Sequence, residues 1–155
     1  MDREELAAWL RLTLTPGVGN GTARKLLGAF GLPQAIFEQA LGALQQVANT
    51  TQAQALRSLP PELDGLLNTT WDWLQQDSVD GVHRQVVVLG DAAYPQALLS
   101  LDDPPLMLYL LGSAGFGSNQ PVVLTNSTHD AINKIANERL IDPALSMAVV
   151  GSRNP

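Results

Sequence analysis

Hydrophobic residues recur at helical spacing through the first half of the chain. Leu6, Trp9 and Leu10 follow an i, i+3, i+4 pattern behind an acidic first turn, which predicts a helix over residues 2–13. A second amphipathic helix is predicted over residues 20–30, between an asparagine that suits its cap and a glycine that suits its end.

Three further helical segments are predicted before residue 80. Pro33 suits the first position of a short helix through residue 40, and residues 41–58 are expected to form one or two short helices. A longer helix is predicted over residues 62–76. Its hydrophobic stripe is expected to comprise Leu63, Leu66, Leu67, Thr70, Trp71 and Leu74.

The spacing changes to that of strands near residue 80. β-branched and apolar runs predict strands at 85–89, 106–111, 122–124 and 148–150, with a helical turn between the first two that starts at Tyr94-Pro95. A capping box formed by Ser127 and Asp130 favours a helix that continues through Arg139. We therefore predict the α/β class, with a helical domain at 1–78 and an α/β domain at 79–155 that contains an insertion at about 113–142.

Composition and charge narrow the range of functions. The 155 residues are 45% hydrophobic and include no cysteine, which permits a real core and excludes disulfides and thiolate metal sites. We find no secretory signal pattern and no apolar run long enough to span a membrane, so we expect a cytoplasmic protein. The net charge is −6, yet residues 1–60 hold five cations against four anions. Any contact with a polyanion must therefore be local.

The first candidate site is the Pro16-Gly17-Val18-Gly19 turn between the first two helices. A Gly-apolar-Gly turn between helices resembles the helix-hairpin-helix motif, in which turn amides meet a nucleic-acid phosphate without reading sequence. Arg24 and Lys25 follow one turn later and could support that contact. The alternative is a tight hairpin whose glycines, Gly17 and Gly19, serve geometry alone.

The second candidate site is Gly151-Ser152-Arg153, directly after the last predicted strand. Backbone amides beside a guanidinium suit a phosphate, because arginine can engage two of its oxygens at once. The alternative is an ordinary turn.

The remaining residues give no catalytic, metal or cofactor site. Asp102-Asp103 precedes two prolines and is expected to form a solvated turn, and His83 and His129 lie too far apart in sequence to suggest a metal site. Gly115-Phe116-Gly117 lacks the third glycine of a dinucleotide fingerprint. We predict a protein that is not an enzyme.

Read together, four groups of residues resemble the DNA-processing protein A family (DprA, also called Smf). The Tyr-Pro, Asp-Pro-Pro, Leu-Tyr and Val-Gly-Ser-Arg series is the specific part of the resemblance. The matching stretches are Leu14-Thr15-Pro16-Gly17-Val18-Gly19 with Leu26-Leu27 and Phe30-Gly31; Tyr94-Pro95 with Leu98-Leu99; Asp103-Pro104-Pro105 with Leu108-Tyr109 and Gly112; and Ala148-Val149-Val150-Gly151-Ser152-Arg153.

This resemblance implies an N-terminal helical domain, similar to sterile-alpha or helix-hairpin-helix modules, followed by an extended Rossmann-like domain. It also implies binding and protection of single-stranded DNA during natural transformation, transfer of that DNA to the RecA recombinase, and a homodimer formed through the Rossmann-like part. The phosphate turn of the family maps onto Gly151, Ser152 and Arg153, with Arg153 expected at a DNA phosphate.

The chain departs from the family pattern at two points. About thirty residues separate Gly112 from the last strand, where the family has a short connection. The rest of the Rossmann-like sheet is expected beyond Pro155, so we expect a truncated Rossmann-like domain whose last strand lacks parallel neighbours, and impaired function of the chain alone. Two alternatives stay open: a fragment of a Rossmann-like nucleotide-processing enzyme, or a helical protein-interaction module.

Overall fold

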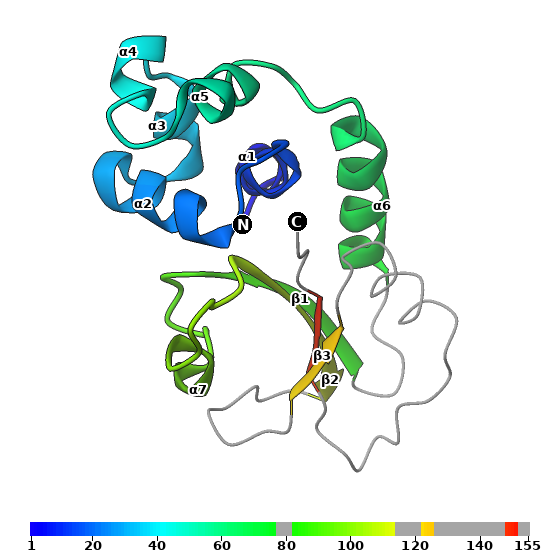
Figure 1. The fold of residues 1–155 in the computed structure, drawn as a ribbon. Helices are drawn as coiled ribbons and strands as arrows, with labels where there is room; N and C mark the ends of the chain where they lie inside the picture. Colours follow the sequence, from blue (N-terminus) through cyan, green and yellow to red (C-terminus); the bar gives the residue numbers. More distant parts are fainter. Residues whose placement is uncertain (77–81, 114–121, 126–147, 152–155) are drawn as a thin grey trace. The chain divides into compact units, whose positions relative to one another are not determined.

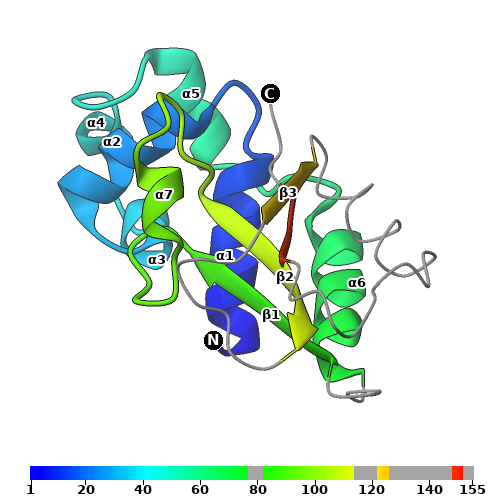
Figure 2. The same ribbon diagram turned by 90° about the horizontal axis from the view of Figure 1, so that it is seen from below.

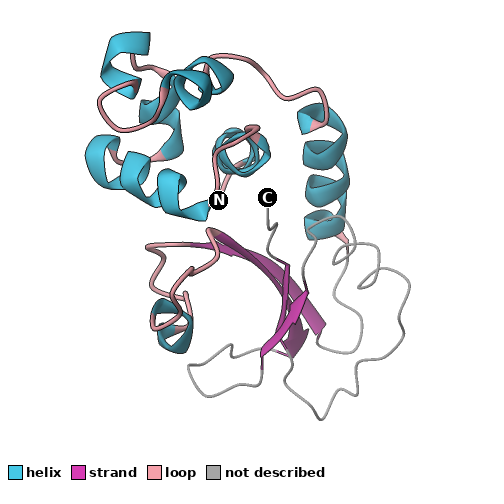
Figure 3. Cartoon of the chain, viewed as in Figure 1, coloured by secondary structure: helices cyan, strands magenta, loops and turns pink. Residues whose placement is uncertain are grey.

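The computed structural model describes residues 1–76, 82–113, 122–125 and 148–151 (Figure 1). Contacts divide the chain into two units, Met1–Thr69 (unit 1) and Thr70–Asn154 (unit 2), with the division inside helix α6. The predicted domain boundary at 78/79 lies outside the described residues. The architecture is mixed α/β and mostly helical, which confirms the α/β class (Figure 3). The elements, in order, are α1 Arg3–Leu14, α2 Asn20–Phe30, α3 Pro33–Phe37, α4 Leu41–Leu44, α5 Thr50–Leu56, α6 Leu63–Gln75, β1 Val82–Val88, α7 Gln96–Leu99, β2 Met107–Ser113, β3 Val122–Thr125 and β4 Ala148–Gly151.

Helices α1 and α2 confirm the first two predicted helices, but the predicted cap of α2 is wrong: Asn20 is the first helical residue and Gly19 is the N-cap. Asp2 caps α1 by accepting a hydrogen bond from the backbone N–H of Glu5 at 2.8 Å, and acidic residues occupy the first turn. Gly31, with a φ of 88°, ends α2 and donates its N–H to the Leu27 carbonyl. The hydrophobic residues that predicted α1 are all buried, so its apolar face packs in the core.

The short helices α3 and α5 are tied to α1 by an arginine. Arg11 donates to the Leu56 carbonyl at 2.9 Å, and its guanidinium lies 3.9 Å from the centre of the Phe37 ring. Burial lowers the pKa of Arg11 from its usual value. A capping box between Asn49 and Gln52 begins α5. The sequence predicted the start of α3 at Pro33 and short helices within 41–58, and both predictions are confirmed.

The buried face of α6 differs from the predicted stripe, because Leu67, Trp71 and Leu74 are only half-buried. Leu63, Leu66 and Thr70 are buried as predicted, but the fully buried tryptophan is Trp73, which leaves 2% of its surface exposed, and not Trp71. The ring of Trp73 meets that of Tyr109 edge to face, with 5.9 Å between their centres. Trp73 lies three residues after Thr70 and seven after Leu66. These three residues therefore form a stripe with helical spacing as regular as that of the stripe predicted from the sequence.

Unit 2 is built around an antiparallel pair of strands, β1 and β2. Val86 pairs with Tyr109 and Val87 with Leu108, which confirms the strands predicted at 85–89 and 106–111. Successive side chains of a strand point to opposite faces of the sheet. Thus Tyr109 meets Trp73 of α6 on one face, while Leu108 packs in a buried cluster with Leu98 of α7 on the other. Figure 2 shows α7 beside the β1–β2 pair. The second group, a buried cluster, consists of Val87, Tyr94, Leu98, Leu108 and Leu110.

Strand β4 has a parallel partner, so the prediction that it lacks one is wrong. It pairs with β3 in a register that places Val123 opposite Val149 and Thr125 opposite Gly151. The valine-rich residues 122–125 supply this partner from within the predicted insertion, and their strand confirms the one predicted at 122–124. β4 also lies beside β2 (Figure 1). The helix predicted after Ser127 falls outside the described residues.

Candidate phosphate-binding turn

A tight turn joins α1 to α2 and contains the first predicted site. The backbone N–H of Val18 donates to the Thr15 carbonyl at 3.2 Å, and Gly17, between them, has a φ of 74°. Proline followed by a residue with positive φ is the pattern of a type II turn, and Pro16-Gly17 supplies it. Gly17 therefore has a geometric reason to be glycine. This agrees with the alternative in which the glycines of the hairpin serve its geometry alone.

Gly19 differs from Gly17, because its conformation does not require glycine. It is the N-cap of α2 with φ −81° and ψ 177°, an extended conformation open to any residue. It provides no side-chain cap, and the first turn of α2 holds no acidic residue. The first intrahelical bond runs from Ala23 N–H to the Gly19 carbonyl at 3.0 Å, so the amides of Gly21 and Thr22 precede the helix ladder. These amides point toward the end of the helix, where an anion would be favoured.

The turn is anchored on both sides. Val18 is buried, and so are Ala23 and Leu26 on the inner face of α2. The Thr15 hydroxyl donates to the Arg11 carbonyl at 2.8 Å and fixes the end of α1. A contact that the sequence reading missed comes from α5, where Gln52 donates to the Gly17 carbonyl at 2.8 Å.

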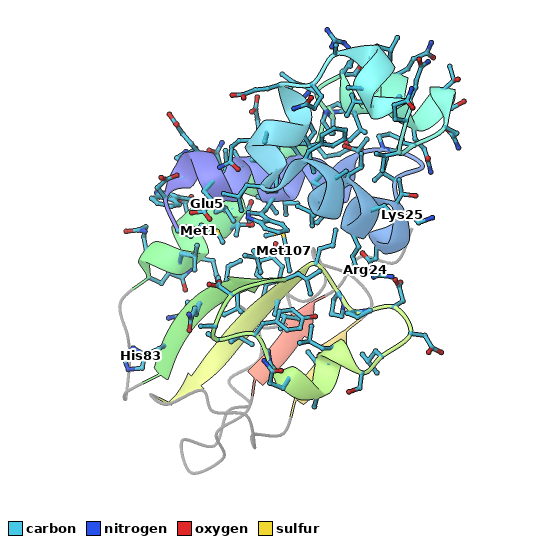
Figure 4. The ribbon with its side chains drawn as sticks, turned by 90° about the vertical axis from the view of Figure 1, so that its left-hand side faces the viewer. Met1, Glu5, Arg24, Lys25, His83 and Met107 are labelled. Carbon is cyan, nitrogen blue, oxygen red and sulfur yellow. The ribbon has the colours of Figure 1, made fainter. Side chains whose placement is uncertain are left out.

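Arg24 and Lys25 lie on α2, close to the turn (Figure 4). Arg24 is half-buried, and one terminal nitrogen of its guanidinium lies 3.9 Å from where a Cβ of Gly21 would sit. The guanidinium therefore reaches back toward the first turn of α2, although Arg24 also interacts with another residue of the chain. Lys25 is exposed. The structure thus places Gly17, Gly19, Arg24 and Lys25 in one short region.

The negative charges of α1 lie at its far end. Asp2, Glu4 and Glu5 belong to the cap and first turn, and the helix then runs 12 residues to Leu14. At 1.5 Å per residue this separates them from the turn by about 15–18 Å along the helix axis. That distance exceeds the Debye length of about 10 Å at 0.1 M salt, so they weaken the potential at the turn only slightly.

The second predicted site is described only in part. Gly151 ends strand β4, while Ser152 and Arg153 lie outside the described residues. No phosphate-binding geometry can be derived there, and the role of these residues stays a prediction.

Several residues of the Tyr-Pro, Pro-Pro and Leu-Tyr motifs in unit 2 are packing residues. The Tyr94 hydroxyl donates to the Pro105 carbonyl at 2.8 Å, which ties the Tyr-Pro motif to the Pro-Pro motif in a buried position. Leu98 and Leu108 pack in the same cluster. Sequence spacing alone did not show this role, because the paired groups lie 11 residues apart, on either side of α7.

Tyr109 is a second buried tyrosine, without exposed surface. Burial raises its pKa above the usual value, and a nearby Thr70 hydroxyl offsets this only in part. Among the described residues, the hydroxyls of Tyr109 and Thr70 make no hydrogen bond of normal geometry. The indole nitrogen of Trp73 also has no partner among them.

No other reactive group emerges from the part of the chain that the structure describes. Within it, no three His, Asp or Glu residues gather as metal ligands. His83 and the Asp102-Asp103 pair are exposed. None of the described helices combines the length and apolar character needed to cross a bilayer.

Comparisons of the chain with protein-family models, with curated proteins and with solved structures found no match. The α1–α2 turn and the motif residues are therefore the features that bear on function.

Proposed function

We propose that this chain takes part in handling single-stranded DNA, and that the α1–α2 turn and the start of α2 contact its phosphates. By the resemblance described above, we further propose RecA as the protein that receives the DNA, and a second copy of the chain as its dimer partner. Gly151, Ser152 and Arg153 are proposed as a second phosphate contact in the same protein.

One observation carries this proposal: no side chain caps the N-terminus of α2, and two cations follow within its first two turns. In unit 1, α1 has an aspartate cap and α5 a capping box, whereas α2, α3 and α4 have neither a side-chain cap nor an acidic first turn. Of these three, α2 is the longest, with 11 residues, and it alone carries two cations, Arg24 and Lys25. A guanidinium placed near the positive end of a helix dipole is unfavourable by itself. The uncapped amides and the nearby guanidinium each have an energetic cost. An incoming phosphate would lower both, because it would accept hydrogen bonds from the amides and pair with Arg24 or Lys25.

The proposal is tested by the binding of a fluorescent single-stranded homopolymer in anisotropy titrations at about 50 mM salt. We expect Lys25→Ala to weaken binding about three- to tenfold, since each phosphate contact contributes about one kcal/mol. Arg24→Ala should act in the same direction. Neither effect should depend on base sequence, because phosphate contacts do not read bases.

Arg3→Ala is the matched control. Arg3 lies at the start of α1, is exposed and hydrogen-bonds Asn68, so its removal deletes the same charge from unit 1 at a distance from the turn. We expect less than a twofold change. Equal losses for Arg3→Ala and Lys25→Ala would show that only net charge matters and would contradict the proposed site.

A further inference from the structure

Gln52 links two parts of unit 1 that are distant in sequence. Its amide nitrogen donates to the Gly17 carbonyl at 2.8 Å and lies 3.4 Å from the Thr22 hydroxyl oxygen, so it contacts both the turn and the first turn of α2. These residues precede it by 35 and 30 positions.

The other end of the Gln52 side chain is also held. Its amide oxygen accepts from the Asn49 backbone N–H at 3.1 Å, and the Asn49 side chain accepts from the Gln52 backbone N–H at 2.8 Å. The capping box therefore fixes which end of the amide faces the turn. Only the nitrogen, a donor without acceptor capacity, can meet the Gly17 carbonyl.

This contact acts on the most adaptable peptide of the turn. Glycine allows the backbone at position 17 to change conformation at little cost, and the Gly17–Val18 peptide leads directly into the cap of α2. A donor that holds the Gly17 carbonyl fixes the plane of that peptide. The amides that follow then keep one direction.

We infer that Gln52 is a positioning residue, which holds the turn in the conformation that presents the α2 amides to phosphate. The inference deepens the proposed function and rests on it for the DNA ligand, while the effect of Gln52 on the turn is independent of DNA.

Gln52→Glu tests the inference with little change in shape. Glutamate retains the capping box, since its carboxylate accepts from the Asn49 N–H, but it replaces the donor to the Gly17 carbonyl with a repelling oxygen. Gln54→Glu is the matched control, because Gln54 is exposed on the same helix and the change in charge is identical.

Two readouts are measured on the whole chain. The first is the amide resonances of Gly17, Val18 and Gly19 in the free protein, which should shift in Gln52→Glu and stay in place in Gln54→Glu. The second is affinity for the single-stranded homopolymer, which should fall at least tenfold in Gln52→Glu and less than threefold in Gln54→Glu.

Protonation provides a rescue that a merely structural role would not show. As the pH falls through the titration of the introduced carboxyl, near pH 4 to 5, its O–H becomes a donor again. The Val18 resonance of Gln52→Glu should then return toward its wild-type position, whereas that of Gln54→Glu should show no such recovery.

The outcomes separate the two proposals. If the wild type binds the homopolymer and the two variants lose affinity equally with unshifted turn resonances, the role of Gln52 is overturned and the proposed function stands. If the wild type does not bind, the proposed function fails, and so does the role of Gln52 in presenting amides to phosphate. If the turn resonances still shift in Gln52→Glu, only the role of Gln52 in holding the turn is supported.

Discussion

At the scale of single residues, the two glycines of the turn have different reasons to be there. Gly17 is required by its positive φ, whereas Gly19 has an extended conformation that other residues adopt without strain. Serine, threonine, asparagine and aspartate are stronger caps than glycine in that position. Gly19 offers no side chain to cap α2, and the proposed phosphate contact depends on this difference, which can be tested.

Gly19→Asp should make the protein more stable and a poorer DNA binder. The introduced carboxylate would accept from the first amides of α2 and complement its dipole, adding about 0.5 kcal/mol of stability. The same carboxylate would occupy those amides and repel phosphate. We expect a slightly raised melting temperature together with at least tenfold weaker binding of single-stranded DNA.

Ala40→Asp is the control for that experiment. Ala40 is the exposed N-cap of α4, with φ −67° and ψ 154° and likewise no side-chain cap, so it offers the same change of charge at a comparable position. It should leave DNA binding within about twofold at moderate salt, since a lone exposed charge remote from the contact is largely screened. Similar binding by both variants would exclude the α2 amides from the site.

At the scale of elements, the packing of α6 against β2 creates a buried tyrosine with a pH-dependent cost. Because the folded pKa of Tyr109 lies above the unfolded value of about 10, stability is unaffected below pH 10. Above pH 10 the unfolded chain loses the phenol proton first, and folding stability should fall by about 1.4 kcal/mol per pH unit from this group.

Tyr109→Phe should remove that loss. The hydroxyl has no hydrogen-bond partner of normal geometry among the described residues, so its removal should cost little near neutral pH. We expect urea unfolding curves of the two proteins to agree at pH 8 and the variant to be more stable by about 1.4 kcal/mol at pH 11. Tyr94, present in both proteins, contributes equally to both. Parallel losses above pH 10 would show that Tyr109 is not the responsible group.

The same elements show what could be read from the sequence. Helix spacing, the Gly31 end and Pro33 were sufficient for unit 1, because local propensity and burial agree there. The sequence could not show that Trp73 and not Trp71 is the buried tryptophan, because both fit an amphipathic helix. Only the contact with Tyr109, on a strand distant in sequence, distinguishes them. Gln52 was missed for a related reason: its partner is a backbone carbonyl, which has no signature in the sequence.

At the scale of the whole molecule, the charge distribution limits how DNA can be held. The chain carries 9 lysines and arginines against 15 acidic residues, yet the described turn has two cations nearby and no acidic residue in the first turn of α2. A protein with this balance cannot attract a polyanion through a broad basic surface. Under the proposed function, affinity would come from few contacts, most of them backbone amides that carry no net charge.

The salt dependence of binding should therefore be shallow. For single strands the slope of log K against log salt is about −0.7 for each phosphate neutralised, so Arg24 and Lys25 together predict a slope near −1.4. Amide contacts release no counterions and add nothing to this slope. Titrations of the single-stranded homopolymer from about 30 to 200 mM salt measure it, and Lys25→Ala should reduce it to about −0.7. A wild-type slope steeper than about −3 would require at least two more cations at the DNA, and the α1–α2 turn could then not be the principal contact.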